Sequence, residues 1–218
     1  MFEDRRDAGR ALARLVATLP DVHAAIVLGL PRGGIPVAFE VARALNLPLD
    51  LLMVRKLGAP GQQELAIGAV AGGGTVTVNR ALVEHFRISP EELLDLIARE
   101  QQEMARREPI YREGAPALPV AGRIAILIDD GLATGATMKA AARAVRPLAA
   151  GVIVAVPVAA ASTLRELESE ADRVLCLSCP EDFEAVGQFY RDFSPATDEE
   201  VRALLAESRR RLQSSPAA

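Results

Sequence analysis

The chain has 218 residues, half of them hydrophobic and a quarter charged, with a formal net charge of -4. This length and apolar content are enough for one domain with a sizeable core, so the composition excludes an intrinsically disordered chain. The weakly acidic balance argues against a nucleic-acid footprint, and a charged N-terminus with no apolar run near roughly 18 residues argues against a signal peptide or a membrane span, so we expect a cytoplasmic protein.

From the N-terminus, apolar residues first recur at helical spacing over residues 5–19, and short apolar runs then follow. Each run has the length of a strand that is buried on both faces, and helical stretches separate the runs. The predicted strands are 24–28, 49–54, 124–128, 152–158 and 174–177, and the predicted helices between them are 35–45, 90–107, 134–148 and 162–169. This alternation predicts one doubly wound, Rossmann-like α/β domain over residues 1–218, with a mainly parallel sheet and helices on both faces.

Three segments depart from that alternation. Residues 64–79 have the pattern of a β-hairpin inserted after the second strand, and we expect a flexible β-arm or lid over about 57–79. The stretch 178–196 is predicted to form a small C-terminal hood. Residues 197–212 are predicted to form a closing helix, with Thr197 and Glu200 as its capping box.

The segment from Ile124 to Thr137 combines features of a site for a phosphorylated sugar. A buried strand is followed by Asp129 and Asp130, then by a Gly/Thr-rich turn that opens a helix. Free backbone N–H groups at a helix N-terminus favour a phosphate. Carboxylates are unfavourable beside phosphate alone, but they can accept hydrogen bonds from vicinal sugar hydroxyls. The spacing therefore indicates a ribose 5-phosphate, against the alternative of an acidic strand end that merely caps a helix.

The run Ile-Leu-Ile-Asp-Asp-Gly-Leu-Ala-Thr-Gly-Ala-Thr, residues 126–137, resembles the phosphoribosyl pyrophosphate signature of type I phosphoribosyltransferases. The resemblance implies that Asp129 and Asp130 hold the ribose hydroxyls of phosphoribosyl pyrophosphate during catalysis. It also implies that the 5-phosphate is bound by Ala133, Thr134, Gly135, Ala136 and Thr137. Together with Phe2 to Gly9 at the N-terminus, the chain resembles over nearly its whole length a widespread bacterial group of predicted phosphoribosyltransferases, whose acceptor the resemblance does not supply.

Two further loops fit the pyrophosphate half of such a donor. The first predicted strand ends in a Gly-rich turn, and the family likeness implies pyrophosphate binding by Arg32, Gly33 and Gly34. Alone, this turn is equally well explained as a tight strand-to-helix connection. The basic pair Arg55 and Lys56 is the candidate for neutralising the leaving pyrophosphate, with an ordinary surface pair as the competing interpretation.

The predicted catalytic set is Asp129, Asp130, Lys56 and Glu64, where Glu64 is the one carboxylate of the predicted lid. Mg²⁺ is the expected cofactor. It is expected to bind pyrophosphate and ribose oxygens and to keep several waters, so no dedicated metal-ligand motif is predicted. The pair Cys176 and Cys179 lacks the two further ligands of a zinc site and is interpreted as packing thiols.

The small-molecule acceptor is the least defined partner. In phosphoribosyltransferases of 6-oxopurines a general-base Asp occupies the position of Ala133, which weakens an oxopurine acceptor. Four of the eight aromatic residues lie within residues 183–193, and Phe183 and Tyr190 are the candidates for stacking on a planar acceptor ring. A small satellite core is the equally weighted alternative.

Two alternatives stay open at this point. One is a regulatory protein that binds the donor but performs no transfer; retention of Arg55, Lys56 and Glu64 favours an enzyme. The other is self-association, since a homodimer is compatible with the sequence.

Overall fold

The computed structural model describes residues 1–20, 22–72 and 74–214, and its core is a parallel five-stranded sheet in the order β2-β1-β6-β7-β8. These strands are β1 (Ile26–Gly29), β2 (Leu49–Leu51), β6 (Ile124–Ile128), β7 (Gly151–Val158) and β8 (Arg173–Ser178). All four residues of β1 are buried, as expected for a strand covered on both faces. The predicted doubly wound, mainly parallel sheet is confirmed.

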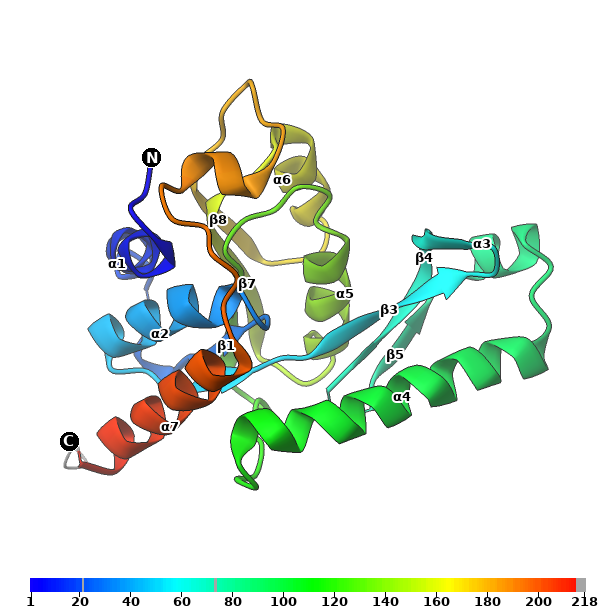
Figure 1. Cartoon of the computed structure of the whole chain (residues 1–218), viewed down its shortest axis with the longest axis horizontal. Helices are drawn as coiled ribbons and strands as arrows, with labels where there is room; N and C mark the ends of the chain where they lie inside the picture. The colour runs from blue at the N-terminus through cyan, green and yellow to red at the C-terminus, as the bar shows by residue number, and fades with distance from the viewer. Residues whose placement is uncertain (21, 73, 215–218) are drawn as a thin grey trace.

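Helices cover both faces of this sheet (Figure 1). One face carries α1 (Arg5–Val16), α2 (Gly34–Leu45) and α7 (Asp198–Ser214), and the other carries α5 (Ala136–Val145) and α6 (Ala161–Leu167). Side chains alternate accordingly, because Ile126 packs in the cluster of α2 whereas Leu127 packs in that of α5. The chain leaves β1 toward one edge and returns beside it as β6, so the loops after these two strands meet where the strand order reverses, the usual ligand position in such sheets.

The inserted arm is larger than predicted. It is an antiparallel sheet of β3 (Val54–Ala59), β4 (Gln62–Ala71) and β5 (Val76–Val78), followed by α3 (Arg80–His85) and α4 (Pro90–Arg112). The second parallel strand ends at Leu51, and Val54 already belongs to the arm. The sequence did not reveal this boundary because residues 49–54 form one continuous apolar run across both sheets. Opening and closing of this arm as a lid stays a prediction.

Helix α4 extends beyond the predicted end at residue 107, through Pro109 to Arg112. Its last turn is held by tertiary contacts. The Tyr111 hydroxyl donates to Asp198 Oδ1 at 2.7 Å, and Arg112 Nε donates to the buried Asp50 Oδ1 at 2.9 Å. These contacts stabilise a helical turn that the local sequence, with its proline, does not favour.

The C-terminal part consists of an irregular hood and the closing helix α7. The Glu200 N–H donates to Thr197 Oγ1 at 3.1 Å, which confirms Thr197 as the N-cap. Within the hood, η2 (Val186–Phe189) is a short 3₁₀ helix, and Phe2 from the N-terminus pairs with Tyr190. No helix among the described residues is long and apolar enough to span a membrane.

Candidate functional site

The acidic pair lies directly beyond the end of β6, beside the loop that follows β1. A Cβ atom added to Gly34 would lie 2.6 Å from the carbonyl oxygen of Ile128 and 2.9 Å from the Cα of Asp129. At the neighbouring position Gly33, a Cβ would lie 2.0 Å from Asp130 Oδ2. Only glycine permits this approach. The two predicted phosphate loops therefore form one continuous surface at the carboxyl edge of the sheet.

The two carboxylates share a desolvated position. Burial, and then the charge of Asp130, raise the pKa of Asp129 well above its usual range. Burial also raises the pKa of Asp130, an effect that the guanidinium of Arg5 opposes. Asp129 Oδ1 accepts the backbone N–H of Asp130 at 2.9 Å, which orients the first carboxylate. Carboxyl groups lose solvation at a cost in stability, and this arrangement is found most often where the groups bind or react with a ligand. A pair with raised pKa values at a loop edge is therefore typical of a functional site.

The predicted 5-phosphate loop has the geometry of an anion site. Helix α5 begins at Ala136 after the N-cap Gly135, whose φ is +65°, and the N–H groups of such a first turn have no acceptor inside the helix. Ala133 and Thr134 are exposed, while Thr137 is partly buried at the cavity described below. Thr163 of α6, which the sequence analysis missed, is buried and donates its hydroxyl to the carbonyl oxygen of Ala133, so it fixes the loop.

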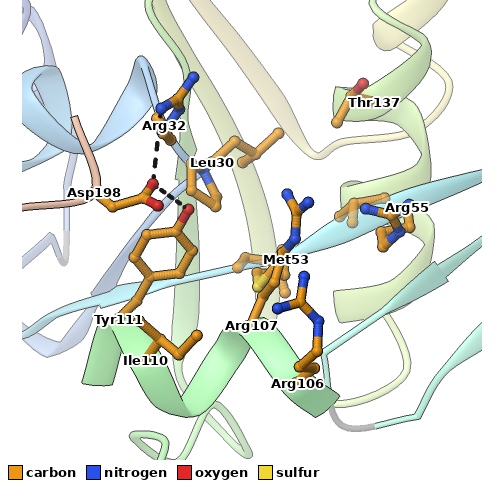
Figure 2. A pocket seen from close by; sticks show the side chains of 13 residues that line it. Leu30, Arg32, Met53, Arg55, Arg106, Arg107, Ile110, Tyr111, Thr137 and Asp198 are labelled. Carbon is orange, nitrogen blue, oxygen red and sulfur yellow. Dashed lines mark hydrogen bonds and ion pairs between the residues drawn. The ribbon is translucent and has the colours of Figure 1, made fainter. Parts of the chain in front are cut away.

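A cavity of about 520 Å³ adjoins these loops (Figure 2). Its wall from the core domain includes Arg32 of the loop after β1 and Thr137 of α5, and its wall from the inserted segment includes Arg55 of β3. Tyr111 and Asp198 form part of the lining, and Arg32 Nη1 lies 3.7 Å from Asp198 Oδ1. The peptide bond Pro31-Arg32 at this loop is cis.

Arg106 and Arg107, which no motif in the sequence singles out, rise from α4 into the same cavity (Figure 2). Four arginines thus face one aspartate among the residues that line it. Glu103 accepts from both α4 arginines, and Glu100 pairs with Arg55. In the sequence, Arg106 and Arg107 look like part of an ordinary solvated helix face. They reach the cavity because α4 returns beneath the loop after β1. The cavity is suited to an anion with several negative charges.

The other predicted residues are distributed differently. Lys56 neighbours Arg55 on β3 but is exposed and is not part of the cavity lining. The side chain of Glu64 lies outside the described part of the structure. Among the described residues, no cluster of three or more His, Cys, Asp or Glu side chains could hold a metal ion. Cys176 and Cys179 are both free, and burial raises the pKa of the Cys176 thiol to about 11, so this thiol stays protonated at neutral pH.

The hood aromatics form a satellite core instead of an open platform. Tyr190 is 5% exposed, and its ring lies 5.5 Å from that of Phe2 and 5.1 Å from that of Phe193. Phe183 is partly buried and stacks on Phe189 at 5.5 Å. In this arrangement Tyr190 offers no free face to an acceptor ring. Its hydroxyl instead donates to the carbonyl oxygen of Asp130 at 2.6 Å, so Tyr190 supports the acidic pair.

The candidate site thus lies at the carboxyl edge of a mainly parallel α/β sheet, and one known family of such proteins matches the sequence. The model of the phosphoribosyl transferase domain matches residues 3–194, so the chain belongs to that family.

Three known proteins show how far the likeness extends. Two Mycobacterium tuberculosis proteins, from strains H37Rv and CDC 1551, carry the provisional name phosphoribosyl transferase. Each is 46% identical over 212 residues, which is 96% of this chain and 47% of the relative, so the chain spans about half the length of these relatives. The crystal structure of TT1426 from Thermus thermophilus is 44% identical, with a TM-score of 0.85 over 94% of this chain and 98% of that one.

Proposed function

We propose that this protein is a Mg²⁺-dependent phosphoribosyltransferase. It would bind phosphoribosyl pyrophosphate across the loops after β1 and β6, transfer the ribosyl 5-phosphate group to a nitrogenous ring acceptor and release pyrophosphate. The observation that carries this proposal is the arrangement at one sheet edge: the acidic pair lies against the loop after β1, and that loop and the first turn of α5 line a cavity with four arginines.

The proposal assigns each part of the donor to a part of the site. The first-turn amides of α5 would hold the 5-phosphate, and Asp129 and Asp130 would accept hydrogen bonds from the ribose hydroxyls. The loop at Arg32 and the cavity arginines would bind the pyrophosphate. As the bond between C1 and the pyrophosphate oxygen breaks, negative charge grows on the leaving group, and fixed guanidinium groups stabilise that charge. A nucleophilic nitrogen of the acceptor would then form the new bond to C1.

The described residues fit Mg²⁺ carried in by the donor better than a resident metal. They include no cluster of three metal-ligating side chains, whereas pyrophosphate oxygens and waters are ligands that Mg²⁺ prefers. Bound in this way, Mg²⁺ would supply further neutralisation of the leaving group. The protein's own contribution is to orient the sugar between the two loops and to hold the charged ends of the donor.

Asp129→Asn tests donor binding directly. The Asn side chain keeps an oxygen for the Asp130 N–H but removes the charge, so affinity for phosphoribosyl pyrophosphate in the presence of Mg²⁺ should fall about tenfold or more, as measured by calorimetry. The melting temperature should stay equal or rise by about 2–4 °C, because a desolvated charge beside another carboxylate is lost. Asp95→Asn, at an exposed position on α4, is the matched control and should leave both quantities unchanged.

Unchanged donor affinity in folded Asp129→Asn protein, or no binding by the wild type, would contradict the proposal. The transfer step needs its own measurement, which is pyrophosphate release with labelled donor and a panel of purines, pyrimidines and small amines. Tight donor binding without release for any acceptor would leave donor recognition standing and remove the transferase assignment.

A further inference from the structure

The N-terminal residues 2–9 have no role in the mechanism above, yet the structure ties them to the donor site. The Asp4 side chain accepts the Asp7 N–H at 2.7 Å and so caps α1. Gly9 allows α1 to cross α2 closely, since a Cβ there would lie 2.6 Å from the Val37 carbonyl oxygen. Phe2 pairs with Tyr190 of the hood. Together these contacts fix the first turn of α1, and Arg5 lies in that turn.

Arg5 makes three contacts with parts of the chain that are far away in sequence. Its Nε donates to Asp130 Oδ2 at 2.8 Å, and its Nη1 donates to the Ser194 carbonyl oxygen at 2.7 Å. Its guanidinium carbon lies 4.0 Å from the centre of the Phe193 ring, a cation–π distance. The two side chains of the ion pair are only 11% and 15% exposed. The guanidinium of Arg5 is therefore fixed in position and connects α1 to the hood and to the donor motif.

The position of this contact on the carboxylate matters for ligand binding. Arg5 engages Oδ2, the oxygen that also lies against Gly33. Oδ1 would then be the oxygen that accepts from a ribose hydroxyl. An arginine in this place fixes the rotation of the carboxylate without occupying both of its oxygens, which is how partners behind a site orient the groups that touch the ligand.

The charges around Asp130 give Arg5 a second effect. Burial raises the pKa of Asp130, and the charge of Asp130 in turn adds to the effect of burial in raising the pKa of Asp129. The Tyr190 ring from the hood adds no charge at neutral pH, because its hydroxyl pKa is raised. Arg5 opposes this effect of burial, although the pKa of Asp130 stays raised above its ordinary value. Asp192, which is exposed in the hood, also lies in the field of Arg5.

We propose that Arg5 is a positioning residue of the donor site, which holds the Asp130 carboxylate oriented for the ribose hydroxyls and so makes the N-terminal helix and the hood part of the site. This inference rests on the proposed function, because it takes the ribose of phosphoribosyl pyrophosphate as the group that Asp130 binds. Substrate need not touch Arg5 for this role.

The experiment measures the affinity for phosphoribosyl pyrophosphate with Mg²⁺ from pH 5.5 to 8.5 in wild type, Arg5→Gln and Arg5→Lys. At each pH the variant is compared with the wild type, which cancels the titration of the donor's own phosphates. Arg5→Gln should bind about tenfold more weakly near pH 6, with a smaller deficit toward pH 8. Without Arg5 the pKa of Asp130 rises, so protonation of this carboxylate weakens donor binding at a higher pH than in the wild type. Arg5→Lys keeps the charge but not the two-pronged donor geometry, so it should restore most of the affinity at low pH.

Arg191→Gln is the matched control. Arg191 also links the hood to the N-terminal segment, through Glu3 at 2.7 Å, but both side chains are more than 60% exposed and the pair does not involve Asp130. This variant should keep wild-type affinity at every pH. Melting temperatures of all variants separate a loss of folding from a loss of binding, and Arg5→Lys provides the comparison if Arg5→Gln does not fold.

Three results would overturn the inference. Arg5→Gln could bind as tightly as wild type or more tightly, or its deficit could be the same at every pH, or Arg5→Lys could bind no better than Arg5→Gln. Each of these would reduce Arg5 to a structural contact or make it a competitor of the ribose. Failure of the wild type itself to bind the donor would overturn the proposed function together with this role, and the wild-type titration alone reveals that case.

Discussion

The two sides of the arginine-lined cavity are built in different ways. On the side of the core sheet, the loops after β1 and β6 touch through backbone atoms, and Gly34 sits against the end of β6 without space for a methyl group. On the opposite side, Arg106 and Arg107 are 63% and 48% exposed and are paired with Glu103. Exposed pairs of this kind contribute little to stability. The core side is therefore fixed before a ligand arrives, whereas the arginines of α4 can exchange Glu103 for a bound anion.

That contrast depends on how α4 is attached, and its main attachment is buried. Asp50 is 2% exposed and accepts from Arg112 Nε at 2.9 Å, from the Leu118 N–H at 2.8 Å and from the Leu51 N–H at 2.8 Å. One carboxylate thus holds the last turn of α4 and the connection after it. The exposed arginines of α4 are placed by a contact that lies behind the cavity.

Asp50→Asn should have the largest effect on stability. Whichever way the amide is turned, its NH₂ group faces a backbone or guanidinium donor, and Arg112 loses its buried counter-charge. We expect destabilisation by about 3 kcal/mol, measured by urea unfolding. Glu108→Gln is the graded control, since Glu108 reaches only the outer nitrogen of Arg112 at 3.1 Å and should cost about 1 kcal/mol or less. An effect of Asp50→Asn no larger than that of Glu108→Gln would show that α4 is held elsewhere.

The core side of this comparison could be predicted from the sequence, and physics explains why. Strands β1, β6 and β7 are short apolar runs whose hydrophobicity follows from burial on both faces, and β8 is a half-buried run at the edge of the sheet. The acidic pair and its turn form a local motif in which neighbours in sequence are neighbours in space. The carboxyl ends of adjacent parallel strands must meet at one edge, so the joining of the two predicted phosphate loops also follows.

The other side could not be predicted in the same way. The chain passes from β2 of the parallel sheet to β3 of the inserted sheet within one apolar run. Because nearly every residue of this run is apolar, its hydrophobic pattern does not show where one sheet ends and the other begins. The contact between Arg5 and Asp130 joins residues 125 positions apart, and Arg106 and Arg107 look like any solvated helix face. For Tyr190, the clustering of aromatics was compatible with either a platform or a satellite core, and the contacts with Phe2 and Phe193 decide for the core.

Gly34→Ala should have the next largest effect, on the rigid side of the cavity. The new methyl group would lie 2.6 Å from the Ile128 carbonyl oxygen, so the start of α2 must move away from β6. We expect a loss of stability of about 1–3 kcal/mol and donor binding weakened more than about tenfold, because both phosphate loops shift. In Gly151→Ala, the control, the nearest atoms lie at 3.5 and 3.9 Å, an ordinary contact. If Gly34→Ala binds the donor like wild type, the core side is less rigid than the glycine contacts indicate.

The double variant Arg106→Gln, Arg107→Gln should have the smallest effect on stability and a clear effect on binding. Since both side chains are largely exposed, the free energy of unfolding should change by less than about 0.5 kcal/mol. Affinity for Mg²⁺-pyrophosphate should fall about tenfold at low salt, and the difference from wild type should shrink as ionic strength screens the charges.

Its control removes the same number of positive charges from exposed positions outside the cavity, as Arg80→Gln, Arg99→Gln. Equal losses of pyrophosphate affinity in the two double variants would mean that only the overall charge of the protein matters. A loss confined to Arg106→Gln, Arg107→Gln would instead place a ligand-binding role on the side of the cavity that local sequence does not reveal.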